Sequence, residues 1–302
     1  MSGQYVHMLI VNELNVTRLQ GLHGFPPLAI AALLKYQRYA ELGAISPDYS
    51  YFYPLQKAWS DAMHRKNVAA MLHAGITQVA AMTGDPERQQ KCFAWLCGYA
   101  AHVATDVTIH PVIALKANGD SGIHRRMEMH QDVRGWQRLG LDDIGVADHF
   151  TSLDGCYSGI HLDPDVELLW SSMLKEAYRD EWDDDPPQFA LWHQAFKLVI
   201  GKVVTQGHAI PFGRHLWIDL GALYPPVNEI DPQYIENLAV PVGGPQHFNQ
   251  IFERAVVSTA RMWIPIARAV YLGDQGYLTA IGAMNLDTGR DDAGNLVFWS
   301  AS

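Results

Sequence analysis

The chain contains few cysteines and few basic residues. Its 302 residues include only three cysteines, Cys92, Cys97 and Cys156. The count is odd and no pair has zinc-finger spacing, so the sequence predicts neither a disulfide framework nor a cysteine-based zinc site. Lys and Arg number 22 against 32 Asp and Glu, which gives a formal net charge of −10. Because binding to a nucleic-acid backbone depends on clustered basic residues, we expect nucleic acid not to be a partner.

The sequence also lacks a long apolar run. No stretch approaches the ~18 apolar residues that a membrane-spanning helix needs. The beginning of the chain has no basic segment, and its first apolar patch, residues 8–11, is too short for a signal peptide. We therefore predict a protein without a transmembrane segment and with a cytoplasmic location, export by a signal-independent route being the alternative. The sequence leaves the oligomeric state open.

The apolar residues that are present follow helical spacing. Hydrophobic residues make up 48% of the chain and charged residues 18%, which is typical of a globular protein. Apolar periodicity and breaker residues predict helices, and no strongly alternating strand stands out. The predicted helices span residues 7–22, 27–44, 55–82, 87–115, 189–204 and 248–272. The sequence thus predicts an all-α fold.

The second half of the chain has a weaker pattern. Residues 141–187 are rich in Asp, Gly and Pro, and residues 180–187 (DEWDDDPP) indicate a solvated acidic loop. Residues 220–244 are interrupted by Pro and Gly and are predicted to be irregular. We expect residues 1–140 to form a helical core. Residues 141–302 would form a helical and irregular extension packed on that core as one compact unit.

Potential metal ligands are concentrated between residues 98 and 132. His102, Asp106 and His110 stand four residues apart, and His124, Glu128 and Asp132 repeat this step. Four residues advance a helix by about 40°, so each set follows one narrow helix face. Imidazole nitrogens and carboxylate oxygens together suit a divalent ion such as zinc.

An alternative interpretation makes these two sets ordinary polar helix faces or salt-bridged pairs. The residues around the first set are strongly apolar, however, and include Phe93, Trp95, Val107 and Val112. Histidine and aspartate on such a helix would be buried, and a buried charge needs a partner or a metal. The sequence therefore favours a metal site.

Further candidate ligands precede this region. Asp48 follows Ser46-Pro47 in a predicted turn between two helices, and His7 lies on the apolar edge of the first predicted helix. His64 and His73 share the next predicted helix but are nine residues apart, so they face opposite sides of it. Only one of these two histidines can face a common site.

In order along the chain, these elements resemble the bacterial zinc-dependent phospholipases C, which are related in fold to the zinc-dependent single-strand nucleases. The resemblance covers roughly residues 5–135. It rests on the early His7 followed by apolar residues, the turn at residues 43–48, a His on the following helix, and the motif G-Y-x-x-H-x-x-x-D at residues 98–106. His110 and the motif H-x-x-x-E at residues 124–128 complete it.

The resemblance implies a cluster of two to three zinc ions. It implies one ion held by Asp48, His64, His102 and Asp106. His64 is preferred over His73 because its separation from Asp48 along the sequence is closer to the family's spacing. A second ion would be held by His110, His124 and Glu128, and a third by His7 with Asp106 as a bridging carboxylate. Asp132 would orient a ligand.

The chain departs from the family at its N-terminus. Secreted members complete the third site with an N-terminal Trp, whereas this chain begins Met-Ser-Gly. His23 is a substitute donor to consider there.

The implied activity is hydrolysis of a phosphodiester by a phospholipase C, with residues 1–140 as its zinc-binding catalytic core. Clustered cations would clamp the phosphoryl oxygens and stabilise the leaving alkoxide, and Asp48 is the candidate base for the attacking water. A glycerophospholipid would yield diacylglycerol and a phosphorylated headgroup, with transient contact to a membrane surface. Tyr51 and its aromatic neighbours would either line the pocket mouth or pack at a helix start.

Two alternatives stay open. One is a zinc-dependent single-strand nuclease or nucleotidase of the same fold. The other is a non-catalytic helical binding protein in which zinc is structural.

Overall fold

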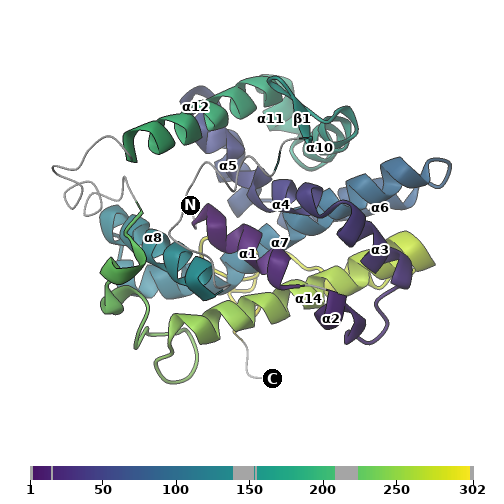
Figure 1. Cartoon of the computed structure of the whole chain (residues 1–302). Helices are drawn as coiled ribbons and strands as arrows, with labels where there is room; N and C mark the ends of the chain where they lie inside the picture. The colour runs from purple at the N-terminus through teal and green to yellow at the C-terminus, as the bar shows by residue number, and fades with distance from the viewer. Residues whose placement is uncertain (1–2, 15, 139–152, 154, 208–223, 300–302) are drawn as a thin grey trace.

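The computed structural model describes residues 3–14, 16–138, 153, 155–207 and 224–299, and these residues fold mainly as helices (Figure 1). Among them, the one sheet is a hairpin of two-residue strands, β1 (Tyr157–Ser158) and β2 (His161–Leu162). The prediction of an all-α fold is confirmed. No helix in the described part of the chain is long and apolar enough to span a membrane.

The longest helix, α7 (Pro86–Ala117), lies at the centre of the molecule and carries the first set of predicted ligands. The Asp85 side chain caps its start by accepting a hydrogen bond from the Arg88 backbone amide at 3.1 Å. Asn118, in the left-handed conformation with φ 45°, ends the helix. Every residue from 92 to 113 is buried, so polar side chains on any face of this stretch lie inside the protein.

Several helices surround α7. Helices α4 (Gln37–Ile45) and α14 (Phe248–Leu272) pack along it, and α1 (Gln4–Glu13) and α8 (Ser121–Arg138) flank it (Figure 1). Gly43 on α4 and Gly98 on α7 allow the two helices to approach closely. A Cβ atom at Gly43 would collide with the Trp95 carbonyl, and one at Gly98 would collide with the Ala40 carbonyl.

Between α1 and α7 the chain forms shorter helices than predicted. The sequence predicted one helix over residues 55–82, but the structure has α5 (Lys57–Arg65) and α6 (Val68–Ala80). The break lies at Asn67, which is left-handed with φ 52° and whose side-chain amide donates to the Ala177 carbonyl at 2.8 Å. The predicted helices over residues 7–22 and 27–44 are each interrupted as well, and the structure has α2 (Val16–Gln20) after α1 and α3 (Pro27–Lys35) before α4.

The prediction of a solvated acidic loop over residues 180–187 is wrong for residues 180–184, which are helical. Helix α10 (Pro164–Ala177) begins at the capping residue Asp163, and α11 (Arg179–Asp184) occupies most of the predicted acidic loop. Acidic residues in the first turn of a helix interact favourably with its dipole, which explains how so acidic a segment is helical. Residues 139–152, in the same stretch, lie outside the described residues.

The remaining elements agree more closely with the predictions. Helix α12 (Phe189–Gly207) extends the prediction by three residues, and α14 has the predicted bounds. Residues 224–244 hold the short 3-10 turns η4 (Val227–Glu229) and η5 (Pro232–Tyr234) and, at Leu238, an isolated β-bridge to Gln246, as expected for an irregular segment. Residues 220–223 lie outside the described part. A short helix, α15 (Tyr277–Ala280), comes after α14.

The C-terminal segment packs against the helices that carry candidate ligands. The Trp299 indole donates to the Thr108 carbonyl at 2.8 Å, and the Leu286 amide donates to the His64 carbonyl at 2.8 Å. Helix α7 also contains Pro111, which has no amide hydrogen to donate to the carbonyl four residues earlier. Contacts from beyond residue 284 therefore brace both α5 and the middle of α7. The boundary at residue 140 between core and extension stays a prediction.

Candidate metal centre

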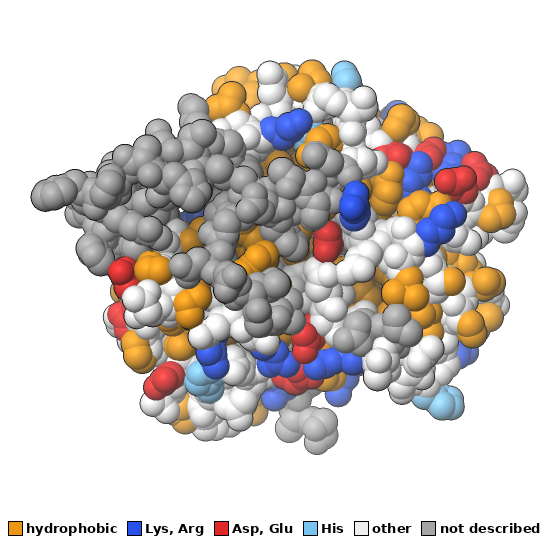
Figure 2. Space-filling model, viewed as in Figure 1, with side chains coloured by type: hydrophobic (Ala, Val, Ile, Leu, Met, Phe, Trp, Pro, Cys, Tyr) orange, Lys and Arg blue, Asp and Glu red, His pale blue; other side chains and the backbone are white. Residues whose placement is uncertain are grey.

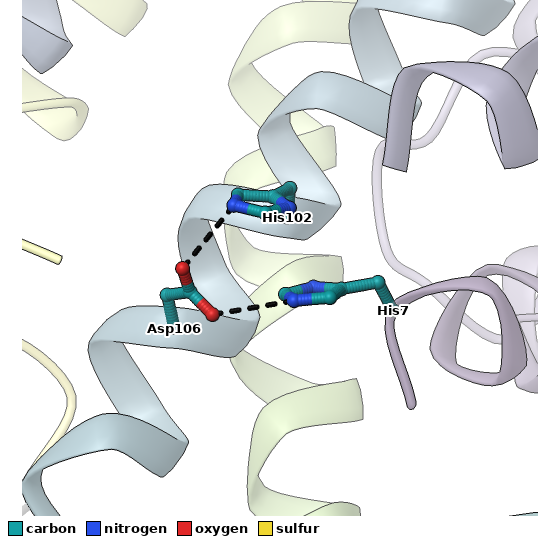
Figure 3. A group of neighbouring side chains, drawn as sticks. All are labelled: His7, His102 and Asp106. Atoms are coloured by element: carbon teal, nitrogen blue, oxygen red, sulfur yellow. Dashed lines mark ion pairs between the residues drawn. The ribbon is translucent and has the colours of Figure 1, made fainter. Parts of the chain in front are cut away.

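Four histidine side chains surround the buried carboxylate of Asp106. On α7, His102 and His110 stand one turn to either side of Asp106, while His7 comes from α1 and His64 from α5. The Asp106 Oδ1 atom lies 3.3 Å from His7 Nε2 and 3.4 Å from His110 Nε2. Its Oδ2 atom lies 3.2 Å from His102 Nε2 and 3.3 Å from His64 Nε2. Figure 3 shows Asp106 between His102 on the same helix and His7 on a separate one.

Backbone carbonyls fix the orientation of two of these histidines. His64 Nδ1 lies 2.7 Å from the Ser60 carbonyl, and His102 Nδ1 lies 2.8 Å from the Ala44 carbonyl. A carbonyl only accepts, so each Nδ1 donates its hydrogen and each Nε2 of a neutral ring carries a lone pair. These two Nε2 atoms face each other at 3.1 Å. Two lone pairs at that distance repel each other unless a proton or a metal ion binds to at least one of them.

Asp48 completes this buried group from the turn between α4 and α5. It lies in the 3-10 helix η1 (Ser46–Phe52), which is tied to α5 because the Ser60 hydroxyl donates to the Pro47 carbonyl at 2.7 Å. The Asp48 side chain is fully buried, and neither carboxylate oxygen has a hydrogen-bond partner. Its Oδ1 atom lies 3.3 Å from His64 Nε2. A buried carboxylate without hydrogen bonds is a group that a cation would satisfy.

Without metal, the buried charges compensate one another through a proton. Burial opposes a charge on His64, but the carboxylates of Asp106 and Asp48, each 3.3 Å from its Nε2 atom, raise its pKa to about 10. Burial also opposes ionisation of Asp48, yet the charges of His102 and His64 lower its pKa to about 2. The pKa of Asp106 is held well below its ordinary value, against burial, by the charges of the surrounding histidines. The site thus keeps two carboxylates ionised in the protein interior.

A second group of ligand types lies where α7 and α8 meet. His124 Nε2 on α8 lies 2.8 Å from Oε1 of Glu128 one turn later, and the rings of His110 and His124 are 5.6 Å apart. Neither ring nitrogen of His110 has a hydrogen-bond partner, and burial lowers its pKa to about 4. A histidine that is neutral at pH 7 and has an available nitrogen can serve as a metal ligand without first losing a proton.

Three sets of donor atoms are therefore close enough to share an ion. Within each set the donor atoms lie within 4.8 Å of one another. The sets are His7 with His102 and Asp106, Asp48 with His64 and His102, and His110 with His124 and Glu128. The structure brings together all eight residues predicted as ligands. Nitrogen and carboxylate donors in sets of three suit zinc.

Comparison with known families identifies the chain. The sequence model of the family described as "Zinc dependent phospholipase C" matches residues 6–180. The chain belongs to this family. The resemblance seen in the sequence is confirmed, and the match continues well beyond the motif region at residues 5–135. No match was found among curated proteins or among solved structures.

Membership in the zinc-dependent phospholipase C family supports zinc as the metal and hydrolysis as the class of reaction. The residues present fit that metal, because the donor sets consist of imidazoles and carboxylates and because Asp48 and His110 are buried without hydrogen bonds. Which of the eight residues bind each ion stays a prediction.

Three other residues considered from the sequence lie apart from these sets. His73 Nε2 lies 2.9 Å from the Ile281 carbonyl, and His23 lies in the turn after α2. Asp132 is buried and accepts hydrogen bonds from the Val6 amide and the Tyr224 hydroxyl, each at 2.8 Å. Asp132 therefore holds the start of α1, the helix that carries His7.

A cavity of about 770 Å³ opens onto the third donor set. His110, His124 and Glu128 all line it, and the His124 side chain is 32% exposed. The rest of its lining is mostly charged or polar. Its charged members are not among the ligands predicted from the sequence, and they are Lys57, Asp61, Arg65, Asp120, Arg125 and Asp287. Lys57, Asp61 and Arg65 show the same step of four as the metal ligands, so this helix face could have been found from the sequence.

Proposed function

We propose that this chain is a phospholipase C that hydrolyses the phosphodiester of a glycerophospholipid and releases diacylglycerol and a phosphorylated headgroup. The observation that carries the proposal is the charged cavity at the set of His110, His124 and Glu128. A purely structural zinc site is closed by protein ligands, whereas this set opens to solvent on one side. Together with family membership, this opening supports a catalytic rather than a structural role.

The eight candidate residues would hold two to three zinc ions, as the resemblance implies. When bound, zinc supplies Lewis-acid stabilisation of the phosphoryl oxygens and lowers the pKa of a coordinated water. The protein's own contribution is to hold these donors in place. The backbone bonds at Ser60 and Ala44 fix the rings of His64 and His102, and burial keeps water away from the Asp106 carboxylate.

Two of the chain's groups are proposed to act on the substrate. Arg125 lines the cavity, and its Nη1 atom lies 3.8 Å from Glu128 Oε2, so its guanidinium is placed beside the position of an anionic phosphate. Asp48 is proposed to accept the proton of the attacking water at a carboxylate oxygen. Its low pKa keeps it ionised at neutral pH, as an acceptor must be.

The test compares substrates and metal content in one design. The zinc-loaded protein is assayed on p-nitrophenyl phosphorylcholine, on phosphatidylcholine vesicles and on single-stranded DNA, each with and without a chelator. We expect chelator-sensitive hydrolysis of the two choline phosphodiesters and none of DNA. Glu128→Gln should abolish it, because the variant removes a charged donor from the open set. Glu41→Gln replaces a buried glutamate outside all three sets and serves as the matched control.

Each contrary outcome has a distinct meaning. Hydrolysis of single-stranded DNA alone would identify a nuclease of the same fold. Retention of zinc without hydrolysis of any substrate would identify a structural metal and a binding protein.

A further inference from the structure

Two carboxylates and one guanidinium form part of the lining of the cavity at the third donor set. The Arg65 side chain on α5 pairs with both carboxylates: its Nη2 atom lies 3.3 Å from Asp61 Oδ1, and its Nε atom donates to Asp287 Oδ2 at 2.7 Å. We call Asp61, Arg65 and Asp287 the acidic wall. Arg65 directly follows the candidate ligand His64, so α5 carries both a part of this wall and a part of the metal centre.

The C-terminal segment brings Asp287 to the acidic wall. The amide of the preceding residue, Leu286, donates to the His64 carbonyl at 2.8 Å, which places Asp287 beside α5. The turn that follows is held by the Thr288 amide, which donates to Asn285 Oδ1 at 3.1 Å. Position 287 lies outside residues 6–180, the range that the family model matches. The complete acidic wall is therefore a feature that membership in the family does not account for.

Two oxygens of the acidic wall have no hydrogen-bond partner among the described residues. The Tyr51 hydroxyl donates to Asp61 Oδ1 at 3.3 Å and Arg65 donates to Asp287 Oδ2, so Asp61 Oδ2 and Asp287 Oδ1 remain unused. The two aspartate side chains are 31% and 40% exposed, so a molecule in the cavity can reach them. The same cavity is lined by His110, which is buried and whose ring nitrogens have no hydrogen bond.

Ion pairing alone would not distinguish this wall from the rest of the surface. Acidic and basic side chains also lie next to one another elsewhere on the described part of the face seen in Figure 2. The acidic wall differs because its unused acceptors line a cavity that opens onto a set of metal donors. Asp120, another carboxylate of the lining, accepts hydrogen bonds from the Gly122 and Ile123 amides instead.

The charge of the wall and the shortage of aromatic faces favour one kind of headgroup. Two carboxylates share one guanidinium, so the acidic wall has a net charge of −1. Apart from histidines, Tyr51 is the aromatic residue among the described lining residues. Its ring already contacts the Lys57 ammonium, 5.7 Å from the ring centroid, and the His64 ring, with 5.6 Å between centroids. A quaternary ammonium lacks N–H groups and is bound by aromatic faces, whereas a primary ammonium donates hydrogen bonds to carboxylates.

We propose that the acidic wall binds the primary ammonium group of an ethanolamine headgroup and makes ethanolamine phospholipids better substrates than choline phospholipids. The ammonium donates hydrogen bonds to Asp61 Oδ2 and Asp287 Oδ1 while the phosphate lies at the open donor set. A choline headgroup enters the same cavity, but its methyl groups leave both oxygens unpaired, so choline esters are slower substrates. This inference rests on the proposed function and specifies its headgroup.

The test compares two soluble esters that differ only in three methyl groups. The value of kcat/KM is measured for the zinc-loaded protein on p-nitrophenyl phosphorylethanolamine and on p-nitrophenyl phosphorylcholine. We expect the ethanolamine ester to be preferred about tenfold, the effect of one charged hydrogen bond. Asp61→Asn and Asp287→Asn keep the side-chain size but remove the charge, and each should bring the ratio close to one. Asp183→Asn breaks an Asp–Arg pair on α11 outside the cavity and is the matched control, which should keep the wild-type ratio.

Calorimetry measures the same preference without hydrolysis. The zinc-loaded proteins are titrated with phosphorylethanolamine and with phosphorylcholine. Wild type and Asp183→Asn should bind phosphorylethanolamine about tenfold more tightly. The two cavity variants should bind both compounds with similar affinity. Zinc analysis and circular dichroism establish that each variant is loaded and folded, as we expect for substitutions in exposed ion pairs.

Three results would overturn the acidic wall as an ammonium site. The first is a wild-type ratio of one or less, and the second is a preference for ethanolamine that both cavity variants retain. The third is faster hydrolysis of p-nitrophenyl phosphoglycerol than of the ethanolamine ester, which would assign the wall to hydroxyl groups. Failure of the proposed function gives a different pattern, in which no ester is hydrolysed, while the ratio of binding affinities still reports on the wall.

Discussion

Replacing Asp106 by Asn tests the centre of the proposed metal cluster. Asp106 belongs to the donor set with His7 and His102, and its Oδ2 atom also lies 3.3 Å from His64 Nε2 in the neighbouring set. The set of His110, His124 and Glu128 does not contain it. The Asn side chain keeps the shape but loses the charge that makes a carboxylate oxygen a strong zinc ligand.

The structure predicts both the metal stoichiometry and the change in stability. We expect the wild type to hold two to three zinc ions and Asp106→Asn to lose at least one of them, while the set of His110, His124 and Glu128 keeps its ion. In the metal-free protein, the substitution leaves the charge on His64 with Asp48 as its remaining partner. Removing one partner of a buried ion pair costs about 3–5 kcal/mol, and because Asp48 remains we expect about 3 kcal/mol.

The assay is zinc per chain by elemental analysis, on protein purified without added zinc. Glu128→Gln is the complementary variant, because it should lose the ion that Asp106→Asn keeps. Glu41→Gln should contain as much zinc as the wild type. A wild type with only a trace of zinc, unchanged in Asp106→Asn, would refute the metal interpretation. The residues at steps of four on α7 and α8 would then be ordinary polar helix faces.

Three further predictions concern pH and stability. Because the pKa of metal-free His64 is raised to about 10, zinc must displace a proton from this ring when it binds. The apparent affinity of the protein for zinc should therefore rise about tenfold per pH unit through neutral pH, and calorimetry can measure the proton release. Burial raises the pKa of Asp132 from 3.8 to about 7, so the native state holds a proton that the unfolded chain has lost, and stability should fall as the pH rises from about 4 to about 7. Asp132→Asn should remove this part of the pH dependence in urea unfolding. A difference in the free energy of unfolding between variant and wild type that stays constant from about pH 4 to about pH 7 would contradict this prediction. Trp299→Phe removes the indole donor to the Thr108 carbonyl and should lower the free energy of unfolding by about 2 kcal/mol, whereas a change near zero would show that this bond does not brace α7.

The ligand positions could be predicted because their pattern is local. A step of four residues places His102, Asp106 and His110 on one face of any α-helix, whatever the helix packs against. The apolar residues around them then indicate burial. The bounds of α14 could be predicted for the same reason, because its apolar residues keep a regular helical period along the whole helix.

Features that depend on distant contacts could not be predicted in this way. The break between α5 and α6 relies on a hydrogen bond from Asn67 to the Ala177 carbonyl, 110 residues away. The cavity is lined by Asp287 from the C-terminal segment and by Lys57 from α5, and no local sequence pattern relates these two positions. Helix α11 could not be predicted because an acidic composition is equally compatible with a solvated loop and with a short exposed helix.

The number of ions that the cluster can hold is limited by His102. His102 belongs to two of the three donor sets, but its Nδ1 atom donates to the Ala44 carbonyl, so only Nε2 can bind metal. A nitrogen with one lone pair binds one ion. When His102 binds the same ion as Asp48 and His64, the set of His7 has His7 and Asp106 left as donors. The two carboxylate oxygens of Asp106 can bridge neighbouring ions. Two zinc ions therefore have three protein donors each, and a third ion at His7 has two among the described residues. We expect this third ion to be the weakest and the first that a chelator removes, an order of loss that titration with chelator and zinc analysis can measure.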